Sequence, residues 1–127
     1  MNANEASRAV VDAAIKVHSA LGPGLLESVY ETCLAHELET RGIRIERQLA
    51  LPVRYGETVV EAGLRIDLLV EQCLVLEIKA VESLLAIRSA QLLTYLKFGN
   101  HPLGLFPNFN VVRMKDGIKR LANGLHE

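Results

Sequence analysis

The chain has 127 residues, of which 50% are hydrophobic and 23% charged, and its formal net charge is −1. This length and composition favour one compact domain over residues 1–127, and the small net charge gives no overall electrostatic argument for nucleic-acid binding. The longest apolar runs are much shorter than the roughly 20 residues of a membrane-spanning helix, and the start of the chain does not resemble a signal peptide. We therefore expect a cytoplasmic protein without membrane attachment.

The cysteines and histidines lack the spacing of a zinc site. Cys33 and Cys73 lie far apart in the chain and outside any CxxC pattern, so we expect free thiols. The four histidines are scattered and are not expected to bind a metal: His18, His36, His101 and His126.

Two amphipathic helices are expected first. Residues 4–21 carry apolar side chains at helical spacing, with Asn4 as the expected N-cap and Gly22 as the stop. The same periodicity resumes after Gly24, and Gly42 is expected to close the second helix. From residue 43 onward the hydrophobic period shortens towards two, which indicates strands.

Three consecutive strands are expected in the middle of the chain. They cover residues 43–55, 57–70 and 73–80, and a turn centred on Gly56 separates the first two. Strands that follow one another with such short connections predict an antiparallel meander.

A third helix and a short strand are expected next. Ser83 is the expected N-cap of the helix and Gly99 its end. Residues 101–109 resemble a strand that Pro107 either places at a sheet edge or terminates, because proline cannot donate to the ladder.

The last segment, residues 111–121, is expected to form a closing hairpin around Asp116 and Gly117. The predicted order is therefore ααβββαβ plus a C-terminal hairpin. This order indicates the α/β (α+β) class, with a mixed β-sheet flanked by helices.

Three charged residues interrupt the two most apolar strands: Asp67, Glu77 and Lys79. Because side chains alternate along a strand, each strand is expected to present one wholly apolar face to the helices and one face that carries charge. A three-residue turn over residues 71–73 pairs residue 70 with residue 74 and places Asp67 opposite Glu77. We adopt this register, since a two-residue turn would put the two carboxylates on opposite faces.

Two interpretations of this cluster stay open at the level of the four residues alone. Opposed carboxylates repel, and a divalent cation such as Mg²⁺ would compensate, with the Lys79 ammonium beside it to orient water or stabilise negative charge on phosphorus. Alternatively, Arg65 pairs with Glu77 and Asp67 pairs with Lys79, which gives an ion-pair cluster that needs no metal.

Further motifs favour the first interpretation. Residues 24–30, GLLESVY, fit the pattern GxxExxY, and residues 91–95, QLLTY, fit QxxxY. Together with Asp67 and the Glu-Ile-Lys run at residues 77–79, they resemble the GxxExxY proteins of the PD-(D/E)XK nuclease superfamily. The resemblance covers nearly the whole chain, and the order of its motifs is more specific than any one of them.

The resemblance implies a restriction-endonuclease-like core in which Asp67 and Glu77 hold Mg²⁺ or Mn²⁺ and Lys79 assists hydrolysis. Glu27 matches the acidic helix residue that can join the metal shell. Gln91 and Tyr95 match an element that flanks the active site in nucleases similar to RecB.

Two further residues are candidates for auxiliary roles at this site. Tyr30 lies three residues after Glu27 on the helix, where it either shares the cleft or is simply core. Arg88 continues the polar stripe of Gln91 and Tyr95, which is aimed either at the sheet edge near Lys79 or at solvent.

The function expected is metal-dependent hydrolysis of nucleic acid, with DNA as the favoured substrate. The alternative is a non-catalytic nucleic-acid-binding or assembly module that keeps the fold. After residue 82 the chain has 6 Lys and Arg residues but 2 Asp and Glu residues, so the C-terminal third is locally basic. A homodimer or a partner subunit would supply further surface. The candidate phosphate contacts, with ordinary surface charge as the alternative, are Lys97, Arg113, Lys115, Lys119 and Arg120.

Overall fold

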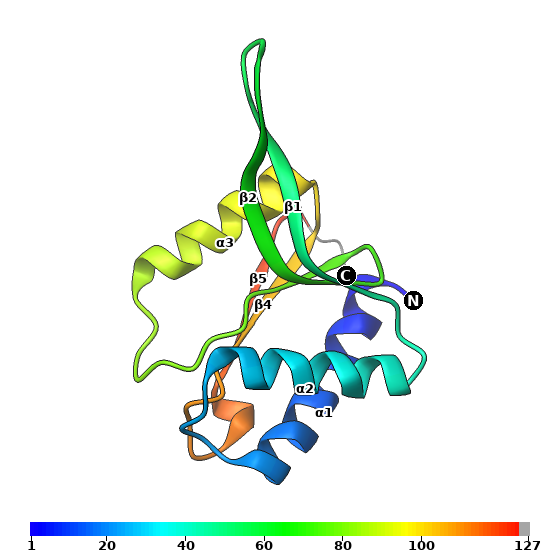
Figure 1. Ribbon diagram of the computed structural model, residues 1–127, viewed down its shortest axis with the longest axis vertical. Coiled ribbons are helices and arrows are strands. Elements are labelled where there is room, and N and C mark those ends of the chain that lie inside the picture. Colours follow the sequence, from blue (N-terminus) through cyan, green and yellow to red (C-terminus); the bar gives the residue numbers. More distant parts are fainter. Residues whose placement is uncertain (125–127) are drawn as a thin grey trace.

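The computed structural model describes residues 1–124 (Figure 1), and residues 125–127, which include His126, lie outside the described part. Its elements are α1 Ala3–Leu21, α2 Glu27–Thr40, β1 Ile45–Tyr55, β2 Thr58–Val70, β3 Leu74–Leu76, α3 Ala86–Gly99, β4 Leu103–Pro107, η1 Met114–Asp116 and β5 Ile118–Ala122.

One sheet joins all five strands in the order β1-β2-β3-β4-β5. Only β3 and β4 run parallel, because α3 carries the chain from one to the other, and the remaining pairs are antiparallel. The mixed sheet flanked by helices that the sequence predicts is therefore confirmed. None of the described helices combines the length and apolar character needed to cross a membrane.

The helices cover both faces of the sheet. One apolar cluster joins α1 and α2 to β3 and β4, through buried side chains such as Val10, Leu34 and Leu76. A second cluster joins α3 to the other face through Leu92 and Leu96. Gly104 of β4 allows the close approach of α3, because a β-carbon there would lie 3.0 Å from the Leu92 side chain.

The starts of α1 and α3 differ from the sequence-based expectation. Asn2 caps α1 instead of Asn4, through a reciprocal capping box in which Asn2 accepts from the Glu5 N–H at 2.8 Å and Glu5 accepts from the Asn2 N–H at 3.1 Å. The N-cap of α3 is Leu85, without a side-chain cap, so the expected role of Ser83 is wrong.

The C-terminal region also differs in detail. Pro107 ends β4, so the expectation that this proline terminates the strand is confirmed. The alternative of an edge strand is wrong, because β4 lies between β3 and β5. Asp116 and Gly117 end the 3-10 helix η1 instead of turning a local hairpin, and β5 pairs with β4. Gly117 is packed against the chain at Asn108, whose carbonyl oxygen would lie 2.3 Å from a β-carbon at residue 117.

The apolar face of β2 changes sides along the strand, so the expectation of one wholly apolar face is wrong. Leu64 and Ile66 pack in the cluster beneath α3, whereas Leu68 and Val70 pack in the cluster beneath α1 and α2. Asp67 lies at the point of change. At the same point of the neighbouring strand β1, the residue opposite Asp67 has a left-handed backbone conformation.

Tyr30 of the GxxExxY motif is core, with 0% of its surface exposed. Its ring stacks on Phe109 with the ring centroids 4.5 Å apart. Its hydroxyl donates to the Gly22 carbonyl at 2.6 Å and accepts from the Leu25 N–H at 3.1 Å. Tyr30 therefore fastens the loop between α1 and α2, which positions the first turn of α2.

We expect Tyr30→Phe to lower the free energy of unfolding by about 1–3 kcal/mol, because two backbone partners lose their bonds while the ring stack remains. Chemical denaturation measures the change. Tyr55→Phe is the matched control, since Tyr55 is 85% exposed, and it should change stability by less than about 0.5 kcal/mol. Equal effects of the two substitutions would contradict the role given to the Tyr30 hydroxyl.

Candidate functional site

The candidate site lies where β2 and β3 separate. The two strands pair through Val70–Leu74, Leu69–Val75 and Leu68–Leu76, which confirms the register that follows from a three-residue turn. Regular pairing stops at Leu76, so the next residues on each strand are Asp67 and Glu77.

The two carboxylates accept hydrogen bonds from backbone N–H groups where the pairing of β2 and β3 ends. The Asp67 N–H donates to Oε1 of Glu77 at 3.3 Å, and the Ile78 N–H donates to Oδ2 of Asp67 at 2.8 Å. Each acidic side chain thus binds the backbone of the opposite strand. The predicted juxtaposition of Asp67 and Glu77 is present, and it has a structural role of its own.

Lys79 is held next to this pair by β4. After β3 ends, the chain stays bonded to the parallel strand through the Glu77 N–H to the Leu105 carbonyl at 3.0 Å and the Lys79 N–H to the Pro107 carbonyl at 3.1 Å. The Lys79 side chain is half-buried, and its positive charge lies near enough to act on the pKa of both carboxyls.

Burial and mutual repulsion disfavour two negative charges here. Burial raises the pKa of Asp67 above its usual value, against the opposing effect of the bond from the Ile78 N–H. Burial, and next the charge of Asp67, raise the pKa of Glu77 from 4.5 to about 8, although Lys79 opposes the shift. The surroundings therefore favour a proton on Glu77 over a second negative charge beside Asp67.

The ion-pair interpretation is not realised in residues 1–124. The ion pairs present there join Lys16 and Arg41 of the helical layer to acidic partners, and Arg47 to Glu31. Within that part of the chain, neither Arg65 nor Lys79 pairs with Asp67 or Glu77 at ion-pair distance.

Glu27 lies close to the same strand end but does not meet the other two carboxylates. It is the first residue of α2, and its Oε2 accepts from the Ala80 N–H at 3.0 Å. Among the described residues, no group of three or more His, Cys, Asp and Glu side chains is assembled for a metal ion. The proposed participation of Glu27 in a metal shell stays a prediction.

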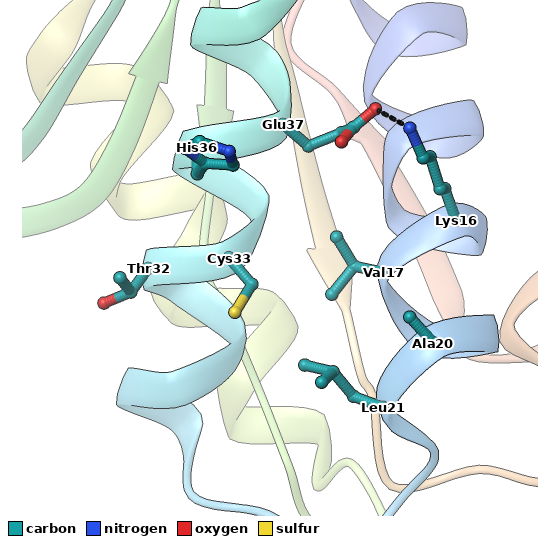
Figure 2. Close-up of a pocket in the computed structure, with 8 residues that line it drawn as sticks. All are labelled: Lys16, Val17, Ala20, Leu21, Thr32, Cys33, His36 and Glu37. Carbon is teal, nitrogen blue, oxygen red and sulfur yellow. Dashed lines mark ion pairs between the residues drawn. The ribbon is translucent and has the colours of Figure 1, made fainter.

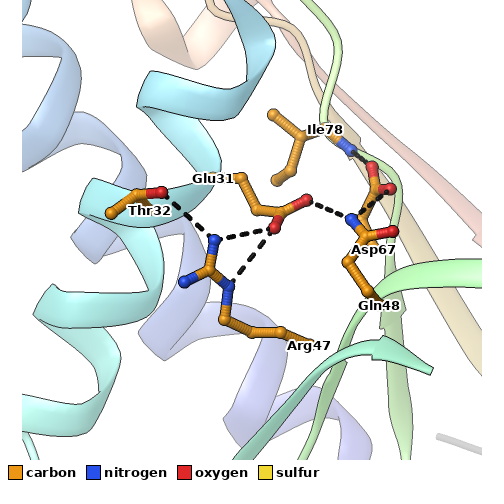
Figure 3. A network of polar contacts seen from close by, with 6 residues as sticks. All are labelled: Glu31, Thr32, Arg47, Gln48, Asp67 and Ile78. Atoms are coloured by element: carbon orange, nitrogen blue, oxygen red, sulfur yellow. Dashed lines mark hydrogen bonds and ion pairs between the residues drawn. The ribbon is translucent and has the colours of Figure 1, made fainter.

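Glu31 and Gln48 belong to the site but were not singled out from the sequence. Glu31 of α2 is 8% exposed, and its carboxylate faces the sheet, where its charge contributes to the raised pKa of both Asp67 and Glu77. Gln48 of β1 links Glu31 to Asp67 (Figure 3). The available signal was helical spacing, because Glu31 lies one turn after Glu27 and beside the buried Tyr30.

The polar stripe on α3 is present, and its members bond to one another. Arg88 donates to Gln91 at 3.4 Å, and Gln91 donates to the Tyr95 hydroxyl at 2.9 Å. Gln91 and Tyr95 are half-buried, and Tyr95 packs against the cluster beneath α3, whereas Thr94 and Lys97 are exposed. Gln91 and Tyr95 therefore lie beside the sheet-facing side of α3, whereas Arg88 is exposed to solvent.

The basic candidates are distributed over several elements. Lys119 and Arg120 are successive residues of β5 and point to opposite faces, and Arg120 donates to Asn4 at 2.8 Å. The other three are exposed on α3, before η1 and within η1: Lys97, Arg113 and Lys115. Their role in phosphate binding stays a prediction.

An apolar groove lies elsewhere, between α1 and α2 (Figure 2). Its volume is about 390 Å³, and the Lys16–Glu37 ion pair of 3.1 Å crosses one end. None of the acidic residues at the separation of β2 and β3 lines it. Its lining residues are Lys16, Val17, Ala20, Leu21, Thr32, Cys33, His36 and Glu37.

Comparison with known families gives an independent result. The sequence model of the PD-(D/E)XK nuclease superfamily matches residues 4–121. The chain belongs to the PD-(D/E)XK nuclease superfamily. The match spans α1 to β5 and so includes every residue of the candidate site. No curated protein and no solved structure matches the chain.

Members of this superfamily generally use divalent metal ions, and the residues here fit such an ion in chemistry. Asp67 and Glu77 offer carboxylate oxygens, the ligands that Mg²⁺ prefers, and Mg²⁺ often takes only one or two carboxylates with water and phosphate completing its shell. Among residues 1–124, no group donates a hydrogen bond to Oε2 of Glu77. Every buried side-chain oxygen in that part of the chain has a hydrogen-bond partner, so Oε2 is not buried and reaches solvent.

The raised pKa of Glu77 predicts a pH-dependent stability. The folded protein favours the protonated carboxyl, so this contribution to stability is complete below about pH 4.5 and is lost as the pH rises through about 8. Glu77→Gln should therefore be more stable than the natural chain at about pH 9 in EDTA, by a few kcal/mol at most, since each pKa unit corresponds to roughly 1.4 kcal/mol.

The advantage of Glu77→Gln should shrink towards about pH 5, as measured by chemical denaturation across the range. The matched control is Glu57→Gln at the exposed β1–β2 turn, which should follow the natural chain at every pH. A stability difference for Glu77→Gln that is constant with pH would contradict this account.

Proposed function

We propose that this chain is a metal-dependent phosphodiesterase that hydrolyses nucleic acid, with DNA as the expected substrate. The observation that carries the proposal is the facing pair Asp67 and Glu77, which has no ion-pair partner within residues 1–124 and lies beside Lys79. Such a pair in a nuclease superfamily member is suited to a hard cation and a phosphate.

Asp67 and Glu77 would hold Mg²⁺ or Mn²⁺, with Glu27 as a further ligand at the same strand end. When bound, the ion would lower the pKa of a water and polarise the phosphate. Lys79 would orient the attacking water or stabilise the negative charge that builds on the phosphoryl oxygens. The hydrogen bond from the Lys79 N–H to the Pro107 carbonyl fixes the position of its backbone. No carboxylate of the described residues forms an ion pair with its ammonium.

Residues farther from the pair would bind and orient the substrate. The bonded stripe of Arg88, Gln91 and Tyr95 would flank the scissile phosphate, because it provides a guanidinium and an amide on a rigid helix. The exposed basic residues of α3, η1 and β5 would contact neighbouring phosphates at positions set by the fold.

A second candidate function is a non-catalytic nucleic-acid-binding or assembly module. The β1–β2 hairpin favours assembly, because it projects beyond the rest of the molecule and exposes Tyr55 and Val60, at 85% and 52% (Figure 1). Its tip carries Glu57 and Glu61 against Arg54, which disfavours phosphate and favours a protein surface. A second copy of the chain in a homodimer, or a partner subunit, would bind this hairpin.

Cleavage assays with two variants test the enzymatic proposal. With Mg²⁺ or Mn²⁺, the natural chain should cleave linear, circular or single-stranded DNA or RNA, and EDTA should stop it. Asp67→Asn should reduce cleavage to the EDTA background, because a neutral amide is a poor ligand for a hard cation. Lys79→Ala should reduce turnover by roughly 10²-fold, as for loss of one transition-state donor.

Lys16→Ala serves as the matched control for Lys79→Ala, because it removes a 68% exposed ammonium on α1 that is not among the candidate phosphate contacts, and it should leave turnover within a few-fold of the natural chain. Full turnover in Lys79→Ala would remove the role assigned to that residue. Folded protein without metal-dependent cleavage of any substrate would favour the assembly module instead.

Metal binding should itself depend on pH. Since the pKa of Glu77 is raised to about 8, a cation must displace a proton near neutral pH. We expect millimolar Mn²⁺ to raise the melting temperature by several degrees at about pH 8.5 and by much less at about pH 5.5. Differential scanning fluorimetry measures this, and an equal increase at both pH values would contradict Glu77 as a ligand.

A further inference from the structure

We propose that Gln48 is a positioning residue, whose side-chain amide fixes the Asp67 carboxylate by tying it to Glu31. This inference rests on the proposed function, since it concerns how the same carboxylate is held ready for a cation. Gln48 lies in β1, and the pairs Arg47–Leu68 and Leu49–Ile66 on either side place it opposite Asp67.

The contacts form a chain that runs from α2 through β1 and β2 to Ile78, shortly after the end of β3 (Figure 3). Nε2 of Gln48 donates to Oε1 of Glu31 at 2.7 Å and to Oδ1 of Asp67 at 3.3 Å. Oδ2 of Asp67 accepts from the Ile78 N–H at 2.8 Å. Both oxygens of Asp67 are therefore held, one by the backbone next to Lys79 and one by Gln48.

Glu31 is itself anchored by a cation. Arg47 donates to Oε2 of Glu31 from Nε at 3.3 Å and from Nη2 at 3.0 Å, and Nη2 also donates to Thr32 at 3.1 Å. Glu31 thus has its charge compensated on the side of α2 and presents its other oxygen to Gln48. Arg47 and Gln48 are adjacent in β1, so one short segment supplies both contacts.

An amide is the side chain that suits this position. The NH₂ group has two donors, so one nitrogen serves two carboxylates at once. It carries no charge, so it orients Asp67 without neutralising it, and the negative charge stays available to a cation. Lysine or arginine at residue 48 would bind the same oxygens and remove that charge.

The backbone at Gln48 indicates that the contact is maintained against strain. Its φ is +49°, in the left-handed region that a residue other than glycine rarely adopts within a strand. The other described non-glycine residues with positive φ lie in a turn or at a helix end: Glu71, Gln72 and Asn100. Glycine would adopt this conformation freely but could not bridge the carboxylates.

That difference gives a test with two readouts. Gln48→Gly keeps the left-handed backbone conformation but loses both amide contacts, so its affinity for Mn²⁺ should fall at least about 10-fold, as for loss of an outer partner of a ligand. Calorimetric titration of the purified chain with Mn²⁺ measures the affinity. The amide resonance of Ile78, in the absence of metal, reports on Asp67 and should shift.

Gln72→Gly is the matched control. Gln72 also has a positive φ, of +60°, and also donates its amide to a glutamate, Glu46, but it lies in the β2–β3 turn. Its replacement should leave both the Mn²⁺ affinity and the Ile78 resonance unchanged. An effect in both variants of equal size would assign the change to the backbone and overturn the inference.

A second variant covers the case in which Gln48→Gly does not fold. Gln48→Asn tolerates the left-handed backbone but is one methylene shorter, so it should lose Mn²⁺ affinity and shift the Ile78 resonance as well. Unchanged affinity and an unchanged resonance in a folded variant would overturn the positioning role. If the natural chain binds no Mn²⁺, the metal centre of the proposed function fails, and the Ile78 resonance alone decides on Gln48.

Discussion

The exchange of hydrogen bonds between Asp67 and Glu77 at the separation of β2 and β3 is the interaction on which the site depends. Two strands that part inside a protein leave N–H groups without partners, and each unpaired group costs stability. Here Glu77 and Asp67 accept from the N–H groups of Asp67 and Ile78. The same bonds that close the strand ends bring two carboxylates together, so the fold and the proposed chemistry share one arrangement.

Each layer of the molecule contributes one restraint to that arrangement. Strand β4 keeps Lys79 in line after β3 has left β2, and α2 brings Glu27 to the Ala80 N–H. Tyr30 fixes the entry to α2 from the core side. The charge at the site is therefore placed by buried neighbours, which restricts motion of the carboxylates and keeps their repulsion in place.

The backbone of β1 has an unusual conformation next to the acidic pair. Gln48 lies opposite Asp67 with a left-handed backbone conformation, and its amide contacts both Asp67 and Glu31. The apolar side of the two strands changes at the same point, so Ile66 and Leu68 pack on different faces. One local backbone conformation thus serves the packing of both layers and the contact with Asp67.

The sequence by itself determined the element order as far as β4, the three-residue turn and the opposition of Asp67 and Glu77, because hydrophobic periods and turn length are local properties. It also indicated the superfamily through the spacing of its motifs. Only the tertiary structure decided that Glu31 and Gln48 join the site and that Tyr30 is core. Those outcomes depend on contacts between residues distant in the chain and on one unusual backbone torsion, which no local pattern encodes.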